Sequence, residues 1–136
     1  MAVIDTNVLL RYLTQDHPEH AELALNLLQR IEAGERSVLL PEGVLVETVQ
    51  VLSSKRLYDV SREVIQLRLA EIIRMSALRM PNKRLYLRAL EVYAGQPRLS
   101  FVDAMLVAYA EREADITVVS FDTDFKEIPS INWQQP

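Results

Sequence analysis

Short apolar segments alternate with helical patterns along most of this chain, and this alternation constrains the fold more than any other feature. Extended segments are predicted at residues 2–4, 37–40 and 116–121, with weaker ones at 77–80 and 131–133. Apolar residues at helical spacing occupy the intervals between them. Such an order predicts an α/β fold with a mostly parallel sheet and helices on both faces.

The interval from Pro41 to Gly95 departs from a regular alternation because it is almost wholly helical in pattern. We therefore expect a three-layer α/β/α domain with a short, mostly parallel central sheet and an extra helical hairpin. Start signals for helices stand at Pro18, Ser61 and Ser100. The chain has 136 residues, the usual size of one domain, so a single domain over residues 1–136 is expected.

Composition excludes several classes of function. There are no cysteines, which rules out disulfides, thiol catalysis and cysteine-ligated zinc. No uncharged apolar run approaches the roughly 20 residues that cross a bilayer, and no signal peptide is visible, so we expect a cytoplasmic protein with no membrane contact. The net charge is −4, and nucleic-acid binding would therefore need local basic patches or a cation bound at an acidic site.

Four carboxylates occupy positions that a simple hydrophobic core does not explain. Asp5 and Asp122 each follow a predicted strand, and the carboxyl ends of parallel strands share the edge where open α/β sheets bind ligands. Glu47 falls in the apolar stripe of its helix, and Asp103 begins an inward-facing series at the start of another. These positions make the four acids candidates for one shared site.

Each acid also has a purely structural interpretation. Asp5 can cap the following helix, Asp122 can form a turn, and Glu47 can be a salt-bridged residue at the margin of its stripe. Asp103 with Ser100 fits a capping box. If the four converged, they would need a counter-charge, and no Lys or Arg lies within these motifs. A hard divalent cation, Mg²⁺ or Mn²⁺, is the simplest candidate.

Four segments resemble, in order and over essentially the whole chain, the motifs of the PIN domain and, more narrowly, those of VapC-type ribonuclease toxins. They are VIDTN (residues 3–7), LVET (45–48), FVDA (101–104) and VVSFDTDF (118–125). The resemblance implies a single PIN-like domain with metal-dependent endoribonuclease activity. It assigns the catalytic acids to Asp5, Glu47, Asp103 and Asp122.

The resemblance also suggests individual roles. Asp5, Asp103 and Asp122 would bind one or two Mg²⁺ or Mn²⁺ ions, and Glu47 would bind a second ion or orient the attacking water. Asn7 and Ser120 would orient ligand carboxylates, although the family usually has Thr in place of Ser120. Asp124 competes with Asp122 as the fourth acid. Apart from the resemblance, an acidic cleft needs basic groups to attract RNA. Arg84 and Arg88, one helical turn apart, are candidate RNA contacts, with a solvated helix face as the alternative.

The residue types favour hydrolysis by a metal-activated water. Attack by the RNA 2′-hydroxyl would call for a pair of histidines, and His17 and His20 stand at a helix start, away from every acidic motif in the sequence. We therefore expect them to be solvated surface residues. The expected products carry a 5′-phosphate and a 3′-hydroxyl.

Other functions stay open. A catalytically inactive PIN-like module that binds RNA or a protein is the main alternative. A haloacid-dehalogenase-type phosphatase would need a second Asp where Asn7 stands, and a receiver domain would need a regular alternation that the helical middle breaks. The resemblance further implies a small antitoxin as partner and a homodimer. The apolar early helices could supply the dimer surface, though core packing explains them equally well: Leu9, Leu10, Leu13, Leu25 and Leu28.

Overall fold

The computed structural model describes all residues from Met1 to Pro136. The chain forms two compact parts, residues 1–83 and residues 84–136, and each is described by itself. Six α-helices, one 3₁₀ helix and five short strands make up the two parts. None of the helices combines the length and the apolar character that a membrane span requires.

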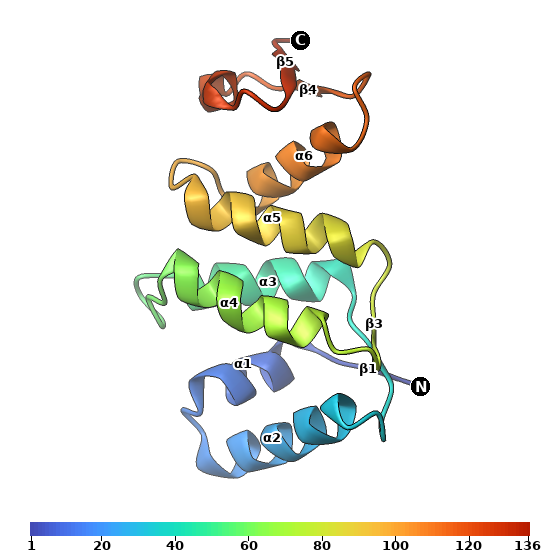
Figure 1. Ribbon diagram of the computed structural model, residues 1–136. Helices are drawn as coiled ribbons and strands as arrows, with labels where there is room; N and C mark the ends of the chain where they lie inside the picture. Colours follow the sequence, from blue (N-terminus) through green and yellow to red (C-terminus); the bar gives the residue numbers. More distant parts are fainter. The chain divides into compact units, whose positions relative to one another are not determined.

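The first part contains a three-stranded parallel sheet and four helices (Figure 1). The strands lie in the order β1-β2-β3, with Val3 beside Leu39 and Leu39 beside Arg79. Helix α1 packs against both α2 and α3, and α3 packs against α4. The elements are β1 (Ala2–Val3), α1 (Thr6–Thr14), α2 (Pro18–Glu32), β2 (Val38–Leu39), α3 (Glu42–Ser53), α4 (Arg62–Ile73) and β3 (Leu78–Arg79).

Local signals place the ends of these helices. Helix α2 begins at Pro18, a residue that suits the first helical turn because its missing N–H would have no partner there. The hydroxyl of Ser61 accepts a hydrogen bond from the Val64 N–H and caps α4. Helices α3 and α4 form the extra hairpin that the helical middle of the sequence predicts.

Buried aliphatic side chains form the core of the first part. Leu9, Leu10 and Leu28 belong to it, whereas Leu13 is half-buried and Leu25 is 36% exposed. Core packing therefore accounts for three of the five leucines that the sequence also offers as a dimer surface. The largest fully buried side chains here are Leu9, Leu28, Ile31, Leu40, Leu45, Ile65, Leu69, Ile72, Ile73 and Leu78.

The second part consists of two helices followed by a two-stranded parallel sheet. Tyr93 and Phe101 pack edge to face with their ring centroids 5.8 Å apart, and Leu90 and Phe125 are fully buried. The elements are α5 (Lys83–Gly95, whose first residue belongs to the other part), α6 (Phe101–Arg112), β4 (Thr117–Val119), the 3₁₀ helix η1 (Thr123–Glu127) and β5 (Asn132–Gln134).

The predicted α/β class with parallel strands is confirmed. The strands are shorter than the apolar runs suggest, and they pair in two sets, β1-β2-β3 and β4-β5. The run at residues 116–121 shows why: the Ser120 N–H makes a last backbone bond to the Gln134 carbonyl, and the chain turns at Asp122 immediately afterwards. The ends of these short strands are where two of the candidate acids stand.

Candidate active site

Asp5 lies at the carboxyl end of β1 and caps helix α1. The Ile4 N–H donates to the Leu39 carbonyl (3.0 Å), which fixes the backbone just before the acid. Oδ1 of Asp5 accepts a hydrogen bond from the Val8 N–H at 3.1 Å, and Oδ2 makes no hydrogen bond. The capping interpretation of Asp5 is confirmed, and it leaves one oxygen of an exposed carboxylate unengaged.

Asp5 also lines a pocket between α1 and α2 with a volume of about 340 Å³. The other polar residues of its wall are Asn7, Arg11 and His20. Val8, Leu23, Ala24 and Leu27 complete the lining. From the sequence alone, neither Arg11 nor His20 is assigned to the site.

His20 is exposed, as the sequence predicts, but it shares this pocket with Asp5 although the two lie far apart in the sequence. The packing of α2 on α1 brings together residues that are 15 positions apart. The signal in the sequence is the spacing i, i+3, i+4, i+7 on α2, which puts His20, Leu23, Ala24 and Leu27 on one face. His17 is half-buried, and its Nδ1 accepts the His20 N–H at 3.2 Å.

Asn7 is exposed and makes no hydrogen bond to Asp5. The Val8 N–H, not the Asn7 amide, holds the carboxylate. Because Asn7 lines the pocket, its amide can reach a ligand there. Its predicted role as the group that orients Asp5 has no support in these contacts.

Glu47 lies on the exposed side of α3 and forms neither a hydrogen bond nor an ion pair. Val44 and Val51, its neighbours on the predicted stripe, are half-buried, while the buried face of the helix centres on Leu45 and Val49. Glu47 is thus at the margin of the apolar face, without the salt bridge that the structural interpretation supposes. Helices α1 and α3 are packed together, so Asp5, which caps α1, and Glu47 of α3 belong to neighbouring elements.

Asp103 forms the predicted capping box at the start of α6. The Ser100 hydroxyl accepts the Asp103 N–H at 3.1 Å, and Oδ2 of Asp103 accepts the Ser100 N–H at 3.3 Å. Oδ1 makes no hydrogen bond, and the side chain is half-buried. The capping box fixes the carboxylate while it uses only one of the two oxygens.

Asp122 caps the 3₁₀ helix that follows β4. Oδ1 of Asp122 accepts the Asp124 N–H at 2.8 Å, and the Ser120 hydroxyl accepts the Asp122 N–H at 3.0 Å. Ser120 therefore acts on the backbone of Asp122 rather than on its carboxylate. The competing acid, Asp124, has Arg98 Nη1 at 3.8 Å from its Oδ1, so a cation already lies beside it.

The three aspartates share one arrangement. In Asp5, Asp103 and Asp122, one carboxylate oxygen accepts a backbone N–H, and the other makes no hydrogen bond. No Lys or Arg forms an ion pair with these three or with Glu47. Carboxylate oxygens that are fixed and unpaired are ligands that suit Mg²⁺ or Mn²⁺.

Neither part of the chain by itself gathers three or more His, Asp or Glu side chains into a metal-binding group. The first part carries Asp5 and Glu47, and the second carries Asp103 and Asp122. The convergence of all four acids stays a prediction.

The two candidate RNA contacts differ in their surroundings. Arg88 donates to Glu111 through Nε (2.8 Å) and Nη2 (3.0 Å), and to Glu91 through Nη1 (3.1 Å). The hydrogen bonds with Glu111 are the main reason that the pKa of Arg88 is raised and that of Glu111 is lowered. Arg84 is exposed and forms no ion pair. Of the two arginines, Arg84 is the one whose charge is uncompensated.

A comparison with protein families matches residues 2–131 to the PIN domain. A search among curated proteins found no match. The family match spans nearly the whole chain and contains Asp5, Glu47, Asp103 and Asp122. PIN domains are generally nucleases, and their α/β/α fold agrees with the helices and parallel strands described above. The chain therefore belongs to the PIN domain family.

Proposed function

We propose that this protein is a metal-dependent endoribonuclease of the VapC type, which hydrolyses phosphodiester bonds in RNA. The observation that carries the proposal is the shared arrangement of Asp5, Asp103 and Asp122, each fixed through one oxygen and unengaged at the other. A purely structural cap needs only the first oxygen. The unpaired second oxygen on each of three acids, at positions that the family match covers, favours metal binding.

Asp5, Asp103 and Asp122 would hold one or two Mg²⁺ or Mn²⁺ ions. When bound, such an ion lowers the pKa of a water molecule and neutralises charge on the leaving oxygen. Backbone N–H groups restrict rotation of the three carboxylates, so little ordering is needed when they bind. Glu47, which has no partner in the protein, would orient the attacking water or accept its proton.

Asp122 is a better fourth acid than Asp124. Asp124 has Arg98 at 3.8 Å, and this cation offsets part of its charge. Asp122 has no such partner, and Ser120 and Asp124 position its backbone and its Oδ1. We therefore assign the metal-binding role to Asp122 and a supporting role to Asp124.

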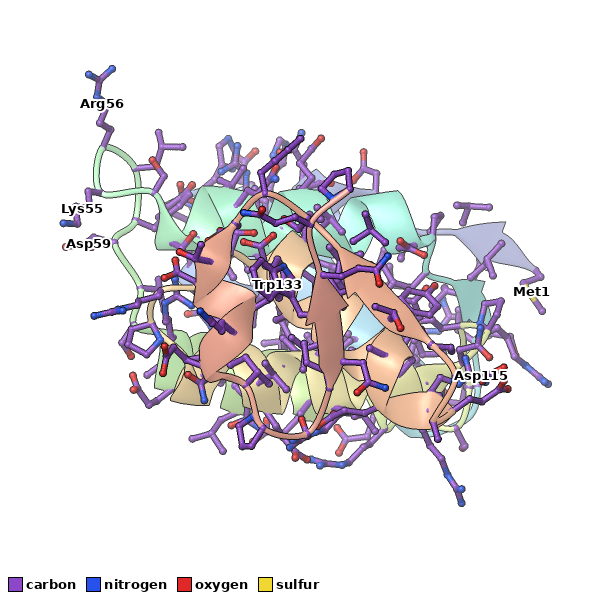
Figure 2. All side chains as sticks on the ribbon, turned by 90° about the horizontal axis from the view of Figure 1, so that it is seen from above. Met1, Lys55, Arg56, Asp59, Asp115 and Trp133 are labelled. Carbon is purple, nitrogen blue, oxygen red and sulfur yellow. The ribbon has the colours of Figure 1, made fainter.

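Exposed cations would attract the RNA to this acidic site. Figure 2 shows Lys55 and Arg56 extending outward from the loop between α3 and α4. Both are exposed and form no ion pair, and the same holds for Arg84. Phosphate contacts from these groups would offset the net charge of −4.

The toxin role is part of the same proposal. It rests on the resemblance of the four motifs to VapC-type proteins, which pair with a small antitoxin and form homodimers. An acidic site with unengaged oxygens also suits an Arg side chain from such an antitoxin. A cytoplasmic location follows from this role.

Cleavage of a panel of single-stranded and structured RNAs tests the proposal. We expect cleavage with Mg²⁺ or Mn²⁺, none with EDTA, and products with a 5′-phosphate. Asp5→Asn keeps a capping oxygen, so the fold should persist while cleavage falls by about 100-fold or more. Asp59→Asn, at an exposed acid outside the four motifs, is the matched control and should cut normally.

The result would contradict the proposal if Asp5→Asn cut as fast as the unchanged protein. RNA binding without cleavage under any metal would instead support the inactive PIN-like module.

A further inference from the structure

We propose that the pocket between α1 and α2 binds one unpaired base of the RNA beside Asp5. This inference rests on the proposed function, because it takes Asp5 as one of the acids that act on the phosphodiester. The pocket volume of about 340 Å³ is within the range of small-ligand pockets, roughly 300–1,000 Å³. The base of a nucleotide whose phosphate lies at Asp5 would already be next to this pocket.

The lining of the pocket suits both the flat apolar face and the polar edge of a nucleobase. Leu23, Ala24 and Leu27 give an apolar surface, which suits the flat face of a heterocycle. Asn7 and Arg11 supply amide and guanidinium groups, which suit the polar edge of a base. Leu23 is 67% exposed although it is large and apolar, and a stacked base would remove part of that surface from water.

Arg11 is the positively charged residue of the pocket wall and favours a ligand with a polar edge. Its Nε is buried and has no hydrogen-bond partner, which is costly for a charged donor. The same guanidinium is held in place because Nη1 donates to both carboxylate oxygens of Asp16, at 2.9 and 3.1 Å. The Arg11 side chain is 28% exposed and lines the pocket, so an acceptor atom on the edge of a base can approach its guanidinium there.

His20 adds an ordered aromatic surface to the pocket. Its ring stacks on the ring of His17, with centroids 3.8 Å apart and planes at 20°. The His20 N–H donates to His17 Nδ1, which orients the His17 ring beneath it. Bases of single-stranded RNA stack on such rings without strong dependence on sequence.

A base satisfies this pocket better than an apolar side chain from a protein would. An aliphatic side chain from a protein could cover Leu23 and Leu27, but it would offer no hydrogen-bonding edge to Asn7 and Arg11 in the same pocket. Asp5, one of the acids assigned to phosphodiester chemistry, lies in the wall of the same pocket.

The first test measures binding, with EDTA present so that no RNA is cut. The probe is a short, unstructured, fluorescently labelled RNA, and the readout is anisotropy. Leu23→Ala and His20→Ala should each weaken binding by about tenfold, the usual effect of losing a stacking partner. His20→Phe keeps a flat ring and should restore binding.

Leu25→Ala is the matched control for Leu23→Ala. Both leucines are exposed residues of α2, and Leu25 does not line the pocket. The control should bind RNA like the unchanged protein. Equal affinity of the Leu23→Ala, His20→Ala and Leu25→Ala variants for the RNA would overturn the inference.

The second test removes the base instead of the side chain. Single abasic positions are scanned through the same RNA, and we expect one of them to weaken binding by about tenfold. The loss should disappear in a variant that combines Leu23→Ala with His20→Ala, because the base then has no surface to lose. An abasic effect of the same size in both proteins would place that base elsewhere.

The outcomes separate this inference from the proposed function. Binding that depends on the pocket, without cleavage under any metal, would support the base subsite and overturn the nuclease. Cleavage with RNA binding independent of the pocket would overturn the subsite alone. If the unchanged protein bound no RNA, both would fail. If the pocket variants kept RNA but lost a protein partner, the pocket would be a protein-binding site.

Discussion

The phenol of Tyr58 donates a hydrogen bond of 2.5 Å to the carboxylate of Asp16, 42 positions earlier in the chain. This bond ties the loop between α3 and α4 to the segment that joins α1 to α2. Asp16 also accepts from Thr14 and from Arg11. The loop that carries Lys55 and Arg56 is thereby connected, through Asp16, to the arginine of the pocket.

Removal of the Tyr58 hydroxyl should change the acid stability of the protein. The hydrogen bond from Tyr58, followed by that from Thr14, lowers the pKa of Asp16 from 3.8 to about 2. Because the folded-state pKa is lowered, the stabilisation is present above pH 3.8 and is lost as the pH falls toward 2. Tyr58→Phe should therefore lower the thermal midpoint at neutral pH but hardly below pH 2.

An NMR titration of the Asp16 carboxyl group checks the cause directly. In Tyr58→Phe its pKa should move up toward 3.8. Tyr109→Phe is the control, since the Tyr109 side chain is far from Asp16 in the sequence and belongs to the other part of the chain. An unmoved Asp16 pKa in Tyr58→Phe would contradict the assigned cause.

The capping box of α6 allows stability and activity to be separated. Ser100→Ala removes the hydroxyl that accepts the Asp103 N–H and should cost about 1 kcal/mol of unfolding free energy, with cleavage largely kept. Asp103→Asn keeps an acceptor for the Ser100 N–H and should retain stability while it loses cleavage. Urea denaturation and an RNA cleavage assay on both variants give the two readouts. The reverse pattern would make Asp103 a structural residue only.

A pair of neighbouring acids distinguishes the metal ligand from its support. Asp122→Asn should reduce cleavage by about 100-fold or more, because it removes a charge that no protein cation offsets. Asp124→Asn should have a much smaller effect, because Arg98 already approaches that carboxylate. Cleavage rates over a range of Mn²⁺ concentrations check this, and a larger loss in Asp124→Asn would exchange the two assignments.

The salt dependence of RNA binding should distinguish Arg84 from Arg88. Removing one phosphate contact lowers the slope of log affinity against log salt by about 0.7 for a single strand. Arg84→Ala should show this change, whereas Arg88→Ala should not, because Glu111 and Glu91 occupy its donors. Titrations at several salt concentrations measure both slopes. An equal reduction in the two variants would mean that Arg88 leaves its carboxylates to bind RNA.

Much of the fold follows from local sequence signals. The apolar alternation, Pro18 and the capping residues Ser61 and Ser100 predict where the elements lie, because these effects act within one or two helical turns. Strand length was less predictable. It depends on where partner strands end, as the Ser120 to Gln134 bond shows, and that is a property of the tertiary fold.

The candidate site also has features that local sequence patterns predict and features that only the tertiary fold determines. The caps formed by Asp5 and Asp103 are local patterns, and the sequence predicts both. His20 lies beside Asp5, and the Nε of Arg11 is buried. Both features depend on how α2 packs against α1, and local sequence patterns do not predict that packing. Glu47 is exposed, although it falls in an apolar stripe at helical spacing. Such a stripe shows which residues share one face of a helix, but it does not show how deeply each of them is buried.

The three caps have a consequence for how this chain can change over generations. A one-base codon change turns Asp into Asn, and Asn keeps an oxygen for the backbone N–H while it loses the charge. At Asp5, Asp103 or Asp122, folding therefore does little to retain the acid. Only selection on chemistry would maintain all three carboxylates, and a lineage released from it could become a stable, non-cutting binder in a single step.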